Sequence, residues 1–137
     1  MHRDLAALIA FLDTRAATAF GWGRKANDCV AFQSATEKAM TGRHRLGELS
    51  WTTPRGALRV IRRLGGLEAA YDARYDRIAP ARARRGDIAG VPDALLGIRI
   101  MVVEGDTLAG PGEHGIKREP RSNMTIAWSI DPKGVRA

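Results

Sequence analysis

The sequence lacks most of the features that would place it in a common class at once. Its 137 residues include one cysteine, so no internal disulfide can form and no oxidising compartment is implied. No run of 18 apolar residues is present, which speaks against a transmembrane helix. No group of ligands has the spacing of a metal site, and no glycine-rich loop has the usual phosphate-binding pattern. We therefore expect no metal and no cofactor.

Acidic residues are also in short supply. The chain has 15 Asp and Glu against 22 Lys and Arg, which gives a net charge of +7. This excess favours an anionic partner, such as an acidic protein or an anionic cell surface, although a solvated basic surface explains it equally well. Aromatic residues make up 6% of the chain and do not interleave with the arginines. We therefore expect no specific binding of nucleic acid, since a stacking platform is missing.

The N-terminal stretch "MHRDLAALIAFLDTRAATAF" is apolar enough to be checked as a signal peptide. Asp4 and Asp13 interrupt its apolar part, and no clean cleavage site follows, so no obvious signal peptide is present. The pattern predicts an amphipathic helix with Asp4 as its N-cap. The apolar face of this helix is expected to comprise Leu5, Leu8, Ile9 and Leu12.

Two more helices are predicted in the first half of the chain. One begins near Asp28 and ends before Gly42, and the other has Thr53 as N-cap and Pro54 as first residue, with Gly65 at its end. The positions expected to pack are Val30, Ala31, Ala35, Ala39, Leu58, Ile61 and Leu64. Trp51 is expected to anchor the loop before the third helix.

The second half has short apolar runs separated by glycine and proline. The runs "GDIAGV", "ALLGIRIMVV", "DTLAG", "HGIKRE" and "TIAWSI" have the spacing of hairpin strands, and Trp128 is expected in the core of the last one. Helices followed by an antiparallel sheet predict an α+β fold. We expect a single domain over residues 1–130, and a tail or docking arm over residues 131–137.

Cys29 stands directly after a polar loop, at the start of the predicted second helix. A helix N-terminus lowers the pKa of a thiol, whereas the neighbouring Asp28, the expected N-cap, acts in the opposite direction. Two interpretations are open. Cys29 is either a nucleophile or a small buried residue, because free cysteine is among the residue types most often buried.

The stretch "FGWGRKANDCVAF", the Gly-Asp pair in "RRGDIAGV" and the strand start "LLGI" together resemble the NlpC-type cysteine peptidases. These are papain-like enzymes that cut peptidoglycan stem peptides. The segment "TTPRGALRVIRRLGG" is similar to small versions encoded in the tail gene clusters of phages and gene transfer agents. The resemblance extends from Phe20 to about Trp128 and implies that the sheet is barrel-like.

The resemblance also implies roles for individual residues. Cys29 occupies the place of the nucleophile, and Leu95 stands where the family has its base histidine, two residues before the glycine of the strand. The third polar residue of the family would fall near Ala109, which is apolar. The residues that match as structural companions are Trp22, Gly23, Asp28, Gly86 and Asp87.

Another histidine would have to replace the missing base. His2 is expected to be solvated, and His44 lies in a loop after the cysteine helix. His114 follows a glycine-rich turn near the second family position and is the remaining candidate base. Glu113 is a poor partner for it, because neighbouring strand residues face opposite ways.

Two functions follow from the resemblance. We favour a structural component of the tail tip of a tailed phage or gene transfer agent, with a degenerate catalytic site. The alternative is an active murein endopeptidase that opens peptidoglycan during DNA entry. In the first case the partners are other tail proteins of the hub or distal tail, with peptidoglycan or an anionic cell surface as further candidates. The protein would be made in the bacterial cytoplasm and become part of the virion.

Overall fold

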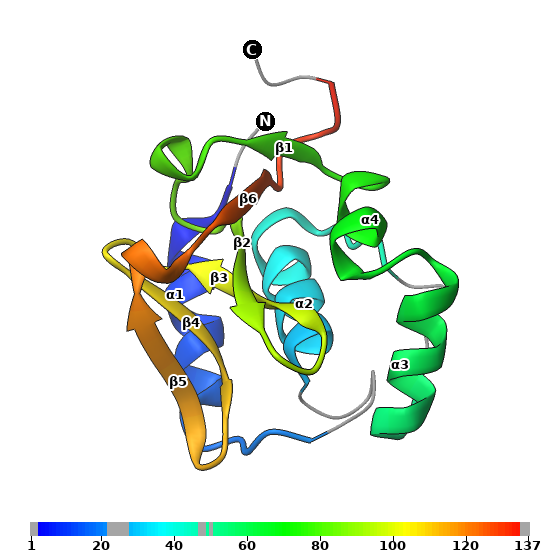
Figure 1. The fold of residues 1–137 in the computed structure, drawn as a ribbon. Coiled ribbons are helices and arrows are strands. Elements are labelled where there is room, and N and C mark those ends of the chain that lie inside the picture. Colours follow the sequence, from blue (N-terminus) through cyan, green and yellow to red (C-terminus); the bar gives the residue numbers. More distant parts are fainter. Residues whose placement is uncertain (1–2, 22–27, 47–48, 50, 135–137) are drawn as a thin grey trace.

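A computed structural model describes residues 3–21, 28–46, 49 and 51–134 (Figure 1). In this part of the chain, helices come first and an antiparallel sheet follows, which confirms the α+β prediction. The helices are α1 (Leu5–Arg15), α2 (Cys29–Thr41), α3 (Pro54–Arg63) and α4 (Leu67–Asp72). The strands are β1 (Asp76–Ile78), β2 (Ile88–Asp93), β3 (Gly97–Val103), β4 (Thr107–Gly112), β5 (Gly115–Pro120) and β6 (Ile126–Ser129). None of the described helices has the length and apolar character needed to cross a membrane.

The sheet is open, so the expectation of a barrel-like sheet is corrected. Its strand order is β1-β6-β2-β3-β4-β5, and all neighbours are antiparallel. Closure would require the two edge strands to pair with each other. The three-residue strand β1 pairs with β6, and β5 pairs with β4, which leaves β1 and β5 at opposite edges.

The predicted helix caps are confirmed. The Asp4 carboxylate accepts the Ala7 N–H at 3.0 Å, and the Thr53 hydroxyl accepts the Gly56 N–H at 3.0 Å. Pro54 is the first residue of α3, where a missing N–H costs no helical hydrogen bond. Each cap supplies an acceptor for a backbone N–H that the first helical turn leaves without a partner.

Two expectations about packing faces are wrong. Leu8 and Leu12 of α1 are buried, but Leu5 and Ile9 are 41% and 59% exposed. The apolar stripe of α1 is wider than the surface it packs on, which comes from α2 and β5. Ala39 is exposed near the end of α2, because the buried face of that helix runs through Thr36, Glu37 and Met40 instead.

Helix α2 lies at the centre of the molecule and packs on β3 and β4 (Figure 1). Its burial is so complete that two polar side chains, Gln33 and Glu37, are enclosed with it. The Tyr71 hydroxyl donates to Gln33 at 2.9 Å, and the Tyr75 hydroxyl donates to Glu37 at 2.5 Å. Burial raises the pKa of Glu37, although Tyr75 and Arg45 oppose this shift. The polar partners make burial of α2 possible, since an enclosed carboxyl without them would be costly.

Trp128 of β6 is fully buried and contacts Tyr71 with the two ring planes tilted by 41°, which confirms its expected place in the core. Trp51 is also buried. Trp22 and Gly23, the predicted companions in the loop before α2, lie outside the described residues.

The Gly86-Asp87 pair forms the turn that leads into β2. Gly86 has a φ of 92°, a backbone conformation that favours glycine, and its N–H donates to the Val103 carbonyl at 2.8 Å. Asp87 is fully buried and accepts the Arg84 N–H at 2.7 Å and the Ile130 N–H at 3.2 Å. Asp87 thus stabilises the turn before β2 and connects it to the residue that follows β6.

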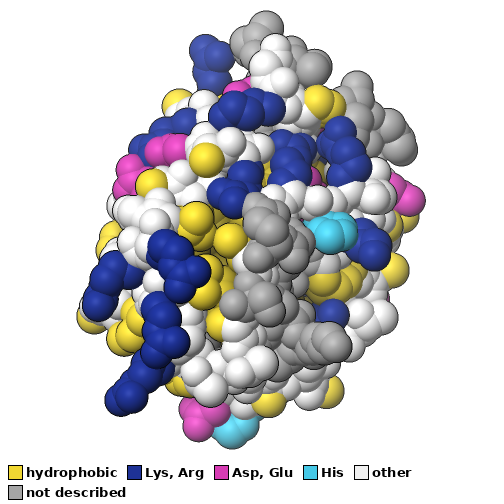
Figure 2. All heavy atoms as spheres, turned by 90° about the vertical axis from the view of Figure 1, so that its right-hand side faces the viewer, with side chains coloured by type: hydrophobic (Ala, Val, Ile, Leu, Met, Phe, Trp, Pro, Cys, Tyr) yellow, Lys and Arg dark blue, Asp and Glu magenta, His cyan; other side chains and the backbone are white. Residues whose placement is uncertain are grey.

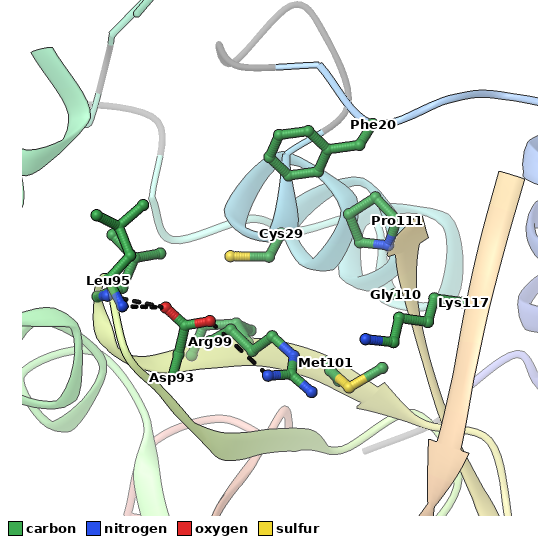
Figure 3. A pocket seen from close by; sticks show the side chains of 11 residues that line it. Phe20, Cys29, Asp93, Leu95, Arg99, Met101, Gly110, Pro111 and Lys117 are labelled. Carbon is green, nitrogen blue, oxygen red and sulfur yellow. Dashed lines mark hydrogen bonds and ion pairs between the residues drawn. The ribbon is translucent and has the colours of Figure 1, made fainter. Parts of the chain in front are cut away.

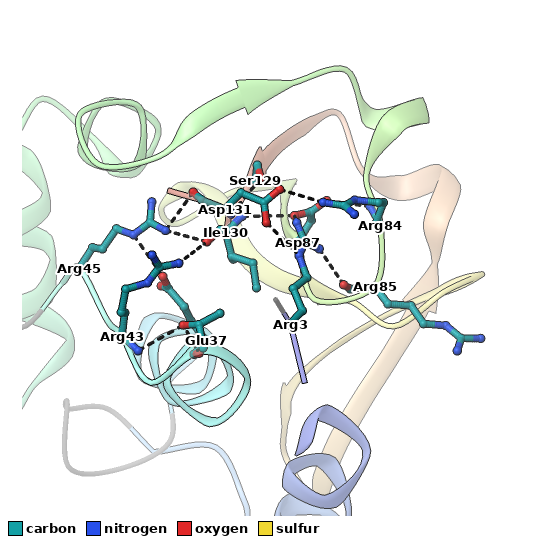
Figure 4. Close-up of polar contacts among 11 residues, drawn as sticks. Arg3, Glu37, Arg43, Arg45, Arg84, Arg85, Asp87, Ser129, Ile130 and Asp131 are labelled. Atoms are coloured by element: carbon teal, nitrogen blue, oxygen red, sulfur yellow. Dashed lines mark hydrogen bonds and ion pairs between the residues drawn. The ribbon is translucent and has the colours of Figure 1, made fainter. Parts of the chain in front are cut away.

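Arginine and aspartate side chains form a network of ion pairs around this turn (Figure 4). Arg3 donates to Asp87 at 2.6 Å and to Asp131 at 3.3 Å, and Arg84 donates to Asp131 at 2.8 Å. The network joins the N-terminal segment, the turn before β2 and the end of β6. Asp131, the first residue of the predicted tail, belongs to it; the domain boundary at residue 130 stays a prediction.

We predict that Gly115→Ala is much more damaging than Gly97→Ala. Each glycine begins a strand after a hairpin turn and has a positive φ, 137° and 80° respectively. A Cβ on Gly115 would lie 2.1 Å from the Ala16 carbonyl oxygen, whereas one on Gly97 would meet nothing within 4 Å. Both variants carry backbone strain of about 1–3 kcal/mol. Urea unfolding should show that Gly115→Ala costs a further ~1–3 kcal/mol, as overpacking does; equal losses would contradict the contact with α1.

Candidate functional site

A pocket of about 190 Å³ opens beside the first turn of α2, between the β2–β3 turn and the β4–β5 hairpin (Figure 3). Its lining is mostly apolar, with three charged side chains at the rim. The lining residues are Phe20, Cys29, Asp93, Leu95, Leu96, Arg99, Ile100, Met101, Gly110, Pro111 and Lys117. The pocket therefore contains the candidate nucleophile and the position of the missing base.

Asp28 positions Cys29 at this pocket. One carboxylate oxygen of Asp28 accepts the Ala31 N–H at 2.8 Å and caps α2, as predicted. The other oxygen accepts the indole N–H of Trp51 at 2.8 Å. Asp28 and Trp51 are both buried, so this single carboxylate connects the start of α2 to the segment before α3.

Cys29 is half-buried, and its surroundings favour the thiol over the thiolate. Burial is the largest cause and raises its pKa from the ordinary value of 9.0 to about 12. A hydrogen bond with the Ile100 backbone works against the shift, while the carboxylates of Asp28 and Asp93 add to it. Burial and two carboxylates outweigh the lowering that a helix N-terminus provides.

The structure brings Leu95 to Cys29 and leaves His114 elsewhere. Leu95 lies in the β2–β3 turn, is 56% exposed and lines the pocket with Cys29 (Figure 3). His114 is exposed in the β4–β5 turn, and His44 is exposed after α2. Among the described residues, the pocket lining includes no histidine. Ala109, the counterpart of the third family position, is fully buried on β4.

Three charged residues of the pocket were missed by the sequence analysis. Asp93 accepts the N–H groups of Leu95 and Leu96 at 3.0 and 2.8 Å and faces Arg99 at 3.8 Å. Aspartate is a common turn residue, so "DALLG" could have indicated from the sequence that Asp93 accepts backbone N–H groups of the turn. Arg99 and Lys117 come from different strands, so no signal in the sequence places them together.

The two cations share one carboxylate. Arg99 forms an ion pair with Glu119, and Lys117 lies 3.6 Å from the same side chain. Arg99 also lies 3.8 Å from Asp93, so the lining has one ion pair and one further cation, Lys117, among mostly apolar side chains. Such a site can hold a ligand with an apolar body and a carboxylate. In the described part of the chain, no cluster of three His, Cys, Asp or Glu residues has an arrangement that would hold a metal ion.

A family model described as "Domain of unknown function (DUF6950)" matches residues 2–130. The chain belongs to the DUF6950 family. No curated protein matches this DUF6950 chain. Among solved structures, it is similar to the crystal structure of the NlpC/p60 domain of the peptidoglycan hydrolase SagA. The TM-score is 0.60 at 18% sequence identity, over 92% of this chain and 98% of that one.

This similarity confirms the predicted NlpC-like fold for the DUF6950 chain. At 18% identity it concerns the arrangement of helices and strands, and it does not carry an activity with it. The chemistry has to be argued from the pocket, where Cys29 is retained and Leu95 stands beside it.

We predict that Cys29 reacts slowly with iodoacetamide and that its rate rises with pH up to about pH 11. With its pKa raised from 9.0 to about 12, Cys29 has about a thousandfold less thiolate at neutral pH. A thiolate of higher pKa is more nucleophilic, which recovers part of the lost rate. At pH 8 the folded protein should react several tens of times more slowly than the same protein unfolded in urea. Mass spectrometry across pH 6–11 measures both rates. A rate that levels off near pH 7 would identify an activated thiolate instead.

Asp28→Ala should destabilise the protein more than Asp4→Ala does. Each substitution removes an N-cap, which costs about 0.5–2 kcal/mol. Asp28→Ala also leaves the buried Trp51 N–H without its acceptor, which costs a further ~1–3 kcal/mol. Urea unfolding followed by tryptophan fluorescence compares the two variants. If both lose the same stability, the contact between Asp28 and Trp51 contributes nothing.

Proposed function

We propose that the DUF6950 chain is a structural component of the tail tip of a tailed phage or gene transfer agent, built on an NlpC-like fold that has lost catalysis. The observation that supports the loss of catalysis is the pocket beside α2, where Cys29 faces Leu95. The tail assignment rests on the resemblance of "FGWGRKANDCVAF" and "TTPRGALRVIRRLGG" to tail-encoded members of the NlpC group.

Cleavage of a peptide by a cysteine needs a thiolate and a proton donor for the leaving amine. The pKa of about 12 keeps Cys29 in the thiol form. Leu95 can neither remove that proton nor deliver one to an amine. The Asp93 carboxylate, held by two backbone N–H groups and close to Arg99, is not placed to serve as the base. The described lining thus offers a binding cavity rather than a catalytic pair.

In this role the protein binds other tail proteins of the hub or distal tail. The apolar lining and the exposed Lys117 suit a segment that carries a carboxylate next to an apolar side chain. The protein would be made in the bacterial cytoplasm and incorporated into the virion. Peptidoglycan and an anionic cell surface are further candidate partners, and the net charge of +7 supports them.

An active murein endopeptidase is the competing proposal, because the thiol of Cys29 still faces an open pocket. His114 would then have to be the base. His114 is exposed in the β4–β5 turn and is not among the described residues that line the pocket, which favours the structural role instead.

The two proposals predict opposite results with purified peptidoglycan. The purified chain should release no stem-peptide fragments. Leu95→His should increase the iodoacetamide reactivity of Cys29 at pH 8, because an imidazole can accept the thiol proton. Release of fragments that Cys29→Ala abolishes would establish the peptidase.

The structural role is tested with assembled particles. Particles that lack the protein should have defective tails, whereas particles with Cys29→Ala should be normal. Normal assembly and infection without the protein would overturn the structural role.

A further inference from the structure

Helix α3 carries four exposed arginines that form no ion pair or side-chain hydrogen bond with any described residue. They are Arg55, Arg59, Arg62 and Arg63. Other arginines of the chain have carboxylate partners: Arg3 pairs with Asp87, and Arg118 pairs with Glu104. No described carboxylate pairs with the α3 arginines in the same way, so α3 presents its charge to the solvent or to a partner.

The four arginines lie on one side of the helix. Spacings of three and four residues place Arg55, Arg59 and Arg62 in one row, with Arg63 beside it. At 1.5 Å per residue, the row from residue 55 to residue 63 is about 12 Å long. Figure 2 views the molecule from the side on which α3 lies and shows a column of basic side chains at its left edge.

This arrangement is unfavourable for the helix by itself. Arg55 and Arg59, like Arg59 and Arg63, are four residues apart, where like charges repel. Arg55 also lies in the first turn, which has no acidic residue and where the helix dipole favours negative charge. Arg62 and Arg63 in the last turn are favourable, but they do not explain Arg55 and Arg59. An anionic partner would remove the repulsion.

The same surface has an apolar element. Leu58 is half-buried and, together with the four arginines, lines a shallow hollow on α3. The helix itself is held by the burial of Ala57 and Ile61 and by packing on α4 at the outside of the molecule (Figure 1). The arginine row can therefore be covered by another molecule without disturbing the core.

We propose that this surface, the α3 arginine face of Arg55, Leu58, Arg59, Arg62 and Arg63, docks an acidic surface of a partner protein. The guanidinium group pairs with carboxylates in a bidentate geometry, and arginine is enriched in protein interfaces. Leu58 supplies an apolar contact among the charges. A protein is favoured over single-stranded nucleic acid because α3 has no aromatic residue on which bases could stack. The proposal goes beyond the tail-tip role, since it uses neither the pocket nor Cys29.

The test measures binding of fluorescent poly-L-glutamate to the full chain by anisotropy at low and moderate salt. Arg59→Gln with Arg62→Gln removes two charges from the α3 arginine face. The control, Lys38→Gln with Arg85→Gln, removes two exposed charges from other parts of the chain. Wild type and control should bind alike, and the α3 variant should bind about tenfold more weakly. Circular dichroism and urea unfolding should be unchanged in both variants, since the substitutions are at exposed positions.

Three results would overturn the proposal. If poly-L-glutamate does not bind, the arginine row is a solvated surface. If the control loses as much affinity as the α3 variant, net charge rather than this surface is responsible. If a short DNA duplex binds more tightly than poly-L-glutamate and loses affinity in the α3 variant, the partner is a nucleic acid. None of these results bears on peptidoglycan cleavage, so failure here is distinct from failure of the proposed function.

Discussion

The Asp28 carboxylate is the contact on which the site depends. It ends the loop before α2 by capping the helix, and it holds Trp51 by the indole N–H, so two distant segments meet at one buried group. The next residue, Cys29, therefore faces the pocket from the first helical turn. The same carboxylate adds to the effect of burial in raising the thiol pKa. One interaction thus fixes the start of α2 and disfavours the thiolate of the neighbouring Cys29.

The pocket beside α2 contains a cysteine, and its described lining includes no histidine. Cys29 and Leu95 both line the pocket, and neither Leu95 nor the buried Ala109 can move a proton. Asp93, Arg99 and Lys117 supply charge at the rim, where it suits recognition of a ligand more than bond cleavage. The arginines of α3, which pair with no described residue, lie on another element, so the pocket and α3 are two separate candidate binding surfaces.

Local signals predicted the helices well and the packing less well. Asp4, Asp28 and Thr53 cap their helices as expected, because a cap requires a side-chain oxygen and a backbone N–H only a few residues away. The apolar pattern of α1 could not show that Leu5 and Ile9 are exposed, since that depends on how far α2 and β5 extend across the helix. The open sheet likewise depends on strand pairing between distant segments, which hairpin spacing does not reveal.

The sequence by itself determined the α+β class, the position of Cys29 at a helix start and the absence of histidine at residue 95. These are properties of residue identity and short spacing. Only the tertiary structure decided that Leu95 meets Cys29 in one pocket, that His114 lies on an exposed turn, and that Arg99 and Lys117 share its rim. Burial also raises the pKa of Cys29, because the pKa of a thiol depends on how far the folded chain removes it from water.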